Sequence, residues 1–234
     1  MQRGPVVAQF HFVEDYERLV AELMAAYPLD EAMSRAVGGR YEEIGLKERT
    51  ILQFAGLRDG MSIIDLGCGS GRLAWALGQS MKLNYLGIDI VLPLLEYAKS
   101  KSPPNYVFAI NRDLKIPANS GTADMITGFS LFTHLLHAET YIYLEEMYRV
   151  LKPGGKVVFS FLEFAQPGHW QVFTETVTAQ RNNVLPHLNM FIERDVINLW
   201  AGKLGFAVEH LVGATEALWS DGPLGQSVAI LRKP

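Results

Sequence analysis

The sequence predicts an α/β fold, in which short buried strands alternate with helices. Apolar strand-like runs recur along the chain, and most are followed by a segment with helical spacing. The clearest run is 63–66, which is apolar except for Asp65 and leads through a glycine-rich turn into a helical segment at 73–79. With 49% hydrophobic and 20% charged residues, the 234-residue chain can bury the core of one α/β domain with a modest addition.

The N-terminal part of the chain predicts helices. One helix face is described by apolar or aromatic residues in steps of three and four: Val13, Tyr16, Val20, Leu23 and Tyr27. Pro28 ends this helix, Asp30 can cap a second one that runs to Val37, and two glycines close it. A third helical run covers 46–55.

Further strands and helices are expected in alternation along the rest of the chain. The expected strands are 83–90, 106–110, 123–128, 156–161, 206–212 and 226–231. The expected helices are 92–100, 141–150, an aromatic-bearing run that contains Phe173, and 194–204. The last two strands are joined only by a loop, so they can pair as an antiparallel hairpin.

The turn after residue 66 suits a nucleotide-like ligand. Its residues follow the order Asp65-x-Gly67-x-Gly69-x-Gly71. Glycines adopt positive φ and let the backbone approach a ligand at the positive end of a helix. Dinucleotide-binding units usually read G-x-G-x-x-G with an acid about 20 residues further on, whereas here an acid lies inside the strand itself.

This order resembles motif I of the class I S-adenosylmethionine-dependent methyltransferases. The run Arg149-Val150-Leu151-Lys152-Pro153-Gly154-Gly155 strongly resembles the helix-to-strand connection of small-molecule members of that class. The resemblance implies a doubly wound, seven-stranded, mostly parallel sheet whose last strand is antiparallel. It also implies an N-terminal helical lid at 1–45 and a Rossmann-like core at 46–234, with a substrate-side insertion at about 163–192. The alternative for the N-terminal helices is simple packing against the sheet.

The resemblance implies S-adenosylmethionine as the cofactor and S-adenosylhomocysteine as its product. The implied cofactor contacts are Tyr41, Asp65, Gly67, Cys68, Gly69, Ser70, Gly71, Arg72, Asp89, Ile90, Arg112, Asp113, Leu114 and Phe129. Asp89 ends a strand, where a carboxylate can accept both ribose hydroxyls or cap the next helix. Asp113 matches the acid that binds the adenine amino group. Tyr41 is a contact for the methionine end, or a core tyrosine.

Two histidines follow the fourth expected strand of the core. The imidazole of His134 or His137 can take a proton from a hydroxyl or amine as it attacks the methyl group. His134 is our candidate base and His137 a substrate contact, and a structural role is the alternative for either. Positioning alone can supply roughly 7 to 11 kcal/mol of the barrier, so a base is not essential. No nearby ligand completes a metal site with this pair, and the only cysteine, Cys68, excludes cysteine-built zinc sites and disulfides.

The segment after the strand at 156–161 is expected to contact the acceptor, because open α/β sheets bind ligands at the carboxyl ends of their strands. Its candidate substrate contacts are Glu163, His169 and Trp170. A loop at 181–190, which includes Pro186, is expected to close this insertion.

We therefore expect methyl transfer to an oxygen or nitrogen of a small molecule by in-line displacement. The alternatives are a sugar or glycan-precursor methyltransferase, a non-catalytic S-adenosylmethionine-binding partner protein and, more remotely, a nicotinamide oxidoreductase. A net charge of -4 and the absence of [DN]-P-P-[YF] at 127–130 count against nucleic-acid substrates. No run reaches membrane-spanning length and no signal peptide is evident, so we expect a cytoplasmic protein. A homodimer is a further expectation, for which the sequence holds no motif.

Overall fold

A seven-stranded sheet forms the centre of the computed structural model, which describes residues 13–184 and 188–234. The strand order is β3-β2-β1-β4-β5-β7-β6. All neighbouring strands are parallel except at β7, which pairs antiparallel with both β5 and β6. The strands are β1 Ser62–Leu66, β2 Asn84–Asp89, β3 Val107–Ile110, β4 Ala123–Gly128, β5 Leu151–Phe161, β6 Ala207–Val212 and β7 Ser227–Arg232. The expected seven-stranded sheet with an antiparallel last strand is confirmed.

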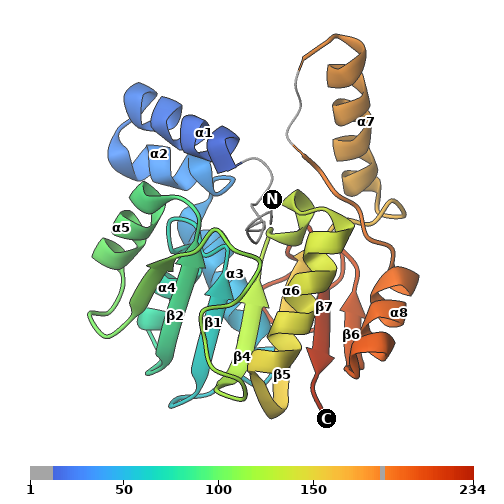
Figure 1. Ribbon diagram of the computed structural model, residues 1–234. Coiled ribbons are helices and arrows are strands. Elements are labelled where there is room, and N and C mark those ends of the chain that lie inside the picture. The colour runs from blue at the N-terminus through green and yellow to red at the C-terminus, as the bar shows by residue number, and fades with distance from the viewer. Residues whose placement is uncertain (1–12, 185–187) are drawn as a thin grey trace, which may run out of the picture.

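Helices cover both faces of the sheet (Figure 1). They are α1 Val13–Ala26, α2 Leu29–Ala36, α3 Tyr41–Phe54, α4 Arg72–Gly78, α5 Leu92–Lys101, α6 His137–Val150, α7 Pro167–Arg181 and α8 Arg194–Leu204, with a 3₁₀ turn η1 at Phe132–His134. Side chains of β5 alternate between the two cores: Val157 and Phe159 pack with α6, whereas Val158 packs with α3 and α4. Burial on both faces explains why the strands read as nearly continuous apolar runs.

Two helices, α3 and α6, begin several residues earlier than the sequence predicted, whereas α5 and α8 begin at the predicted residues. α3 starts at Tyr41 instead of residue 46, so it runs continuously across the expected boundary between 45 and 46. Gly45 lies inside this helix because α3 packs very closely on α4: a Cβ at this position would lie 2.4 Å from the carbonyl oxygen of Arg72. α6 starts at His137 instead of residue 141, and Glu139 accepts the backbone N–H of Leu136 at 2.8 Å there.

The proline–glycine turn expected at 152–155 is part of β5. The strand begins at Leu151, directly after α6, and its register with β4 shifts between Ala123 and Met125. Gly154 has φ of +79°. The turn signal therefore produces an irregular start of the strand, with no separate loop before it.

The carboxyl ends of β1, β2 and β4 lie along one edge of the sheet, beneath α1 and α2 (Figure 1). α7 projects from the same edge at its other end. Open α/β sheets bind ligands at this edge, where the strand order reverses, and here the reversal falls between β1 and β4. Among the described residues, no helix is long and apolar enough to cross a membrane. Pro186 of the expected loop and residues 1–12 of the expected lid lie outside the described residues.

Candidate functional site

The glycine loop connects β1 to α4 at the carboxyl edge of the sheet. Gly67, Gly69 and Gly71 have φ of 66°, 54° and 82°, a region that disfavours any side chain. A Cβ on Gly69 would lie 2.6 Å from Cγ1 of Val37, and one on Gly71 would lie 2.6 Å from Cβ of Ala98. The absence of a side chain at Gly69 therefore lets Val37, which follows α2, pack against the loop, and the absence of one at Gly71 lets α5 do so. At Gly69 and Gly71, the missing side chain thus gives room to other parts of the protein.

Asp89 ends β2 and holds this loop with its carboxylate. Oδ2 accepts the N–H of Gly69 at 2.8 Å, and Oδ1 accepts those of Ile90 and Val91 at 2.8 and 3.1 Å. Burial raises the pKa of Asp89, and the backbone N–H groups oppose that rise because they favour the charged form. A carboxylate offers about four acceptor sites, so capacity remains for a ligand hydroxyl. Asp89 can therefore accept N–H groups at the start of the helix after β2 and still accept a ribose hydroxyl.

Asp65 lies deeper than the loop that follows it. Its Oδ2 accepts the hydroxyl of Tyr85, on the neighbouring strand β2, at 2.6 Å. Burial raises the pKa of Asp65 to about 8, although the Tyr85 hydrogen bond works in the opposite direction. The structure thus places this carboxyl group inside the sheet, apart from the N–H groups of the loop.

Cys68 also points inward. Its side chain is buried, and burial raises the pKa of the thiol well above its ordinary value. The thiol sulfur would lie 3.0 Å from a Cβ at Gly87, so that glycine makes room for it. A neutral, buried thiol is a poor nucleophile. The Cys68 side chain, expected as a cofactor contact, packs inside the protein.

The N-terminal helices are bonded directly to the glycine loop. The Tyr41 hydroxyl donates to the Ser70 carbonyl oxygen at 2.9 Å, and the Ser70 hydroxyl donates to that of Met33 at 2.9 Å. Arg72 donates to the Val37 carbonyl oxygen at 2.6 Å and forms an ion pair with buried Glu48 at 2.5 Å. The side chains of Ser70 and Arg72, expected as cofactor contacts, are therefore engaged with the protein itself.

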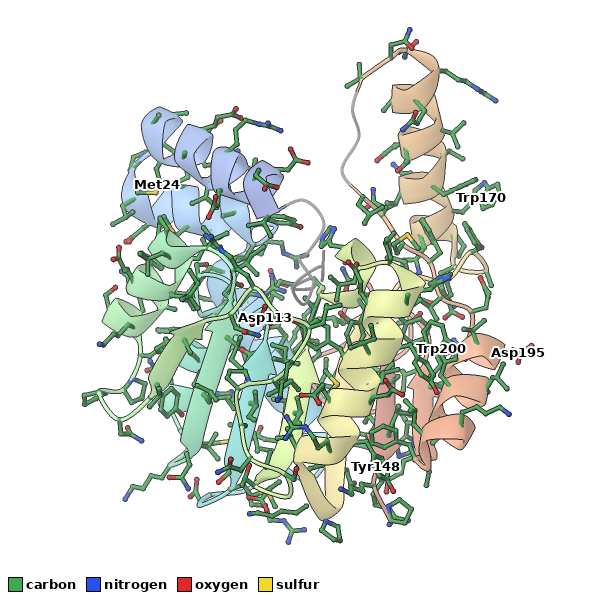
Figure 2. The ribbon with its side chains drawn as sticks, viewed as in Figure 1. Met24, Asp113, Tyr148, Trp170, Asp195 and Trp200 are labelled. Atoms are coloured by element: carbon green, nitrogen blue, oxygen red, sulfur yellow. The ribbon has the colours of Figure 1, made fainter. Side chains whose placement is uncertain are left out.

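The loop after β3 lies beside Asp89 on the same edge. Arg112 forms an ion pair with Glu17 of α1 and donates to the Ile90 carbonyl oxygen at 3.4 Å. Leu114 is buried in the core. Asp113 is exposed at this edge (Figure 2), and its carbonyl oxygen accepts from Asn111 at 2.9 Å. The backbone of Asp113 is thus fixed, while its carboxylate is directed to the surface.

Tyr16 of α1 lies near both Asp89 and His134. Its ring packs against the cluster that contains Val20 and Val91 and meets the ring of His134 edge-on, with 5.6 Å between centroids. Burial and the nearby charge of Asp89 raise the pKa of Tyr16. From the sequence, Tyr16 could be predicted only as one residue of a helix face, because its position near His134 depends on contacts between distant segments.

The loop after β4 brings His134 to the site but not His137. Phe129 is buried in the α3-side core, and Nδ1 of His134 lies 2.8 Å from the carbonyl oxygen of Leu188. Nε2 of His137 lies 2.9 Å from the carbonyl oxygen of Phe191, and its ring packs on Trp200 of α8 at 5.7 Å. His137 therefore contacts the α8 side of the molecule, which gives it a structural role.

Glu163, an expected substrate contact, is hydrogen-bonded to side chains of two other segments. Both of its carboxylate oxygens accept from Arg194 at 2.8 Å, and Ser227 donates to Oε1 at 2.6 Å. Burial alone would raise the pKa of Glu163, but the hydrogen bonds from Arg194 and Ser227 outweigh it and hold the pKa below its usual value.

His169 and Trp170 diverge at the start of α7. His169 is buried, with Nδ1 3.0 Å from the Glu163 backbone nitrogen and Nε2 3.2 Å from the Gly225 carbonyl oxygen. A neutral ring protonated at Nε2 satisfies both contacts, because Nδ1 then accepts and Nε2 donates. Trp170 is 50% exposed and lies on the side of α7 turned away from α1 and α2 (Figure 2). Neither is brought together with Asp89 and His134.

The sequence is similar to those of known methyltransferases. Residues 63–155 match a family model described as a methyltransferase domain. The chain is 31% identical over 137 residues to a demethylmenaquinone methyltransferase of Lactococcus lactis subsp. lactis (strain IL1403), an overlap of 55% of this chain and 52% of that protein. The chain thus spans about half the length of the curated relatives it matches.

Solved structures share the fold across almost the whole chain. A SAM-dependent methyltransferase from Aquifex aeolicus is 18% identical with a TM-score of 0.63, covering 89% of this chain and 100% of that one. Magnesium protoporphyrin IX methyltransferase from Synechocystis PCC 6803, solved with bound SAH, is 16% identical with a TM-score of 0.61, covering 100% and 90%. The residues that match the methyltransferase domain include the glycine loop. The fold is the one that these solved SAM-dependent methyltransferases share, which agrees with the resemblance carried by the sequence motifs.

Proposed function

We propose that this protein transfers a methyl group from S-adenosylmethionine to an oxygen or nitrogen of a small-molecule acceptor. The observation that carries the proposal is the Asp89 carboxylate held against the Gly69 N–H, at the edge where the strand order reverses. The Asp89 carboxylate can accept hydrogen bonds from sugar hydroxyls, and the glycines beside it can let a ligand approach the backbone. When bound, S-adenosylmethionine supplies an electrophilic methyl group on a sulfonium sulfur.

The residues around Asp89 fit the remaining parts of such a cofactor. Ile90 offers a partly buried apolar side chain on the β2–β3 side, and the exposed carboxylate of Asp113 can accept from an amino group. The glycine loop admits the chain that joins the sugar to the sulfur. On the α1 side, the rings of Tyr16 and His134 contact each other, with 5.6 Å between centroids.

We propose His134 as the general base, on the basis of its hydrogen bond with the backbone of another segment. A carbonyl oxygen can only accept, so its contact with Leu188 at 2.8 Å assigns the proton of a neutral ring to Nδ1. Nε2 then carries the lone pair that takes a proton from an attacking hydroxyl or amine. The fixed tautomer supports the proposed role of His134, which is expected to contribute about 10² to 10⁴ in rate.

The nature of the acceptor is supported by the curated relatives. They are named for demethylmenaquinone, a small molecule. We extend only the class of acceptor to this protein, because the overlap is about half of each relative.

The test is transfer of labelled methyl from S-adenosylmethionine into a host extract separated into small-molecule and macromolecular fractions. Label in the small-molecule fraction is the expected result. Label only in macromolecules would contradict the small-molecule assignment. Cofactor binding without any label would instead favour the non-catalytic alternative.

A second test compares two aspartates, Asp89 and Asp124, each of which accepts a backbone N–H at 2.8 Å. Asp89→Asn is expected to raise the Kd for S-adenosylhomocysteine about 10-fold or more, since a charge-assisted hydrogen bond is lost. Asp124 is the control: it accepts the N–H of Ser62 at 2.8 Å, but lies at the start of β4, on the opposite edge. Calorimetric titration checks both variants. Equal Kd values for Asp89→Asn, Asp124→Asn and the unaltered protein would show that the cofactor binds elsewhere.

A further inference from the structure

Three side chains from separate segments form a hydrogen-bonded chain at the carboxyl edge of the sheet. Ser130 follows β4, Ser160 is the penultimate residue of β5, and Gln226 immediately precedes β7. The Ser130 N–H donates to the Ser160 hydroxyl oxygen at 2.7 Å. The Ser160 hydroxyl donates to Oε1 of Gln226 at 2.6 Å, and the Ser130 hydroxyl reaches the same oxygen at 3.3 Å.

This chain of bonds sets the orientation of the Gln226 amide. The Ser160 side chain is fully buried, and its oxygen already accepts the Ser130 N–H, so its single proton must go to Gln226. The amide oxygen of Gln226 therefore faces Ser160, and the NH₂ group faces away. Within 13–184 and 188–234, no residue accepts a hydrogen bond from that NH₂ group. Gln226 is only half-buried, so both N–H donors remain available to a ligand.

The chain of bonds lies beside the glycine loop. Leu131, the neighbour of Ser130, covers Gly67: a Cβ on that glycine would lie 3.1 Å from Cδ1 of Leu131. Ser130 itself has φ of 55°, a left-handed conformation that is unfavourable for serine and is retained only where surrounding contacts enforce it. Here the bond to Ser160 is one such contact. Strained backbone of this kind is concentrated at ligand sites.

We propose that Gln226 binds the methyl acceptor, by donating its side-chain N–H groups to a carbonyl-type oxygen of that molecule. Ser160 and Ser130 are positioning residues that hold the amide in the donating orientation. This inference rests on the proposed function, since it places the acceptor next to a cofactor in the glycine loop. It also deepens that function, because an acceptor without such an oxygen leaves the two donors unpaired and is rejected.

The sharpest variant is Gln226→Glu, which keeps the shape of the side chain and its acceptance of the Ser160 hydroxyl but replaces the donors by an anionic oxygen. The probe is labelled S-adenosylmethionine with a dilution series of the small-molecule extract fraction, which separates apparent KM from kcat. We expect Gln226→Glu to raise the apparent KM about 10-fold or more, and Gln226→Met to raise it about 3- to 10-fold. The Kd for S-adenosylhomocysteine should stay unchanged in both variants.

Ser160→Ala tests the positioning role. The amide is then free to rotate, so the apparent KM should rise by about 2- to 5-fold with little change in kcat. The matched control is Gln53→Glu, the same substitution at an exposed position of α3, which should retain the KM of the unaltered protein.

An unchanged apparent KM in Gln226→Glu overturns the assignment. Failure of the unaltered protein to transfer any label contradicts the proposed function instead. A readout that does not need turnover separates the two cases: the side-chain amide resonances of Gln226, identified by their loss in Gln226→Glu, should shift when the fraction is added to the S-adenosylhomocysteine complex. Unshifted resonances overturn the assignment as well.

Discussion

Asp65 couples the stability of the sheet to pH. Its carboxyl group is buried beside the Tyr85 hydroxyl, and its pKa in the folded protein is about 8, compared with about 4 in an unfolded chain. Between these values the folded protein binds a proton that the unfolded chain has lost. The stabilisation is therefore fully present below about pH 4 and is lost as the pH rises towards about 8.

Asp65→Asn should remove this pH dependence, because an amide does not titrate. From pH 5 to pH 8, we expect the free energy of unfolding of the unaltered protein to fall by about 1 to 3 kcal/mol more than that of the variant. Denaturant unfolding at several pH values measures both slopes. Parallel slopes would mean that Asp65 is already ionised in the folded protein.

At the scale of single residues, the sequence was informative where a role depends on local spacing. Gly69 and Asp89 could be identified because a strand, a turn and a second strand end have a recognisable order, and the Gly69 N–H to Asp89 contact joins them. Tyr16 and Gln226 could not, since each reaches the site through contacts with distant segments. The same limit applies to Glu163, whose partner Arg194 lies 31 residues further along.

Among the elements, α8 is anchored by its first residue. Arg194 binds the Glu163 carboxylate after β5 and also donates to the Leu211 carbonyl oxygen in β6 at 3.3 Å. One guanidinium thus ties the ends of two strands to the start of a helix. Because Glu163 has a lowered pKa, its contribution is present above the ordinary glutamate pKa and is lost as the pH falls.

Glu163→Gln should destabilise the fold by about 1 to 3 kcal/mol at pH 7, since the buried side chain that binds Arg194 loses its charge. The difference from the unaltered protein should shrink at about pH 4, near the ordinary pKa of glutamate. Glu175→Gln, on the exposed surface of α7, is the control. If Glu163→Gln melted normally but raised the apparent KM for the acceptor, the substrate role read from the sequence would be correct.

The strands were the easiest elements to predict, because burial on both faces leaves an unbroken apolar run. Helix starts were harder. α3 begins after Arg40, which has φ of 50°, and contains Gly45, and both features read locally as a loop. Only the packing of α3 on α4 explains why the helix continues through that glycine. Element type was thus predictable from pattern, whereas boundaries depended on tertiary contacts.

Across the whole molecule, α1 and α2 cover the edge that carries the glycine loop (Figure 1). α1 buries only Val13 and Val20 of its 14 residues. An element with so few buried side chains opens more readily than the central strands. The sequence predicted these helices and their order, but their place across the site follows from Tyr16 and from the bonds to Ser70 and Val37.

Hydrogen exchange should report this arrangement. In the free protein, we expect the amides of α1 and α2 to exchange faster than those of β1 and β4. Adding S-adenosylhomocysteine should slow exchange in α1 and α2 by about 10-fold, because a ligand beneath them stabilises the closed arrangement. α8 is the internal control, and equal slowing of α1 and α8 would show only a general stabilisation.

The hydrogen bonds between the N-terminal helices and the glycine loop also have a consequence for the rate of turnover. The Tyr41 hydroxyl holds the Ser70 carbonyl oxygen, and the Ser70 hydroxyl holds that of Met33, so a ligand under α1 and α2 is enclosed by the loop that binds it. In an enzyme closed in this way, spent cofactor departs only when these contacts open. Under the proposed function, a product bound there would leave only as fast as these contacts open, so its release would slow each cycle.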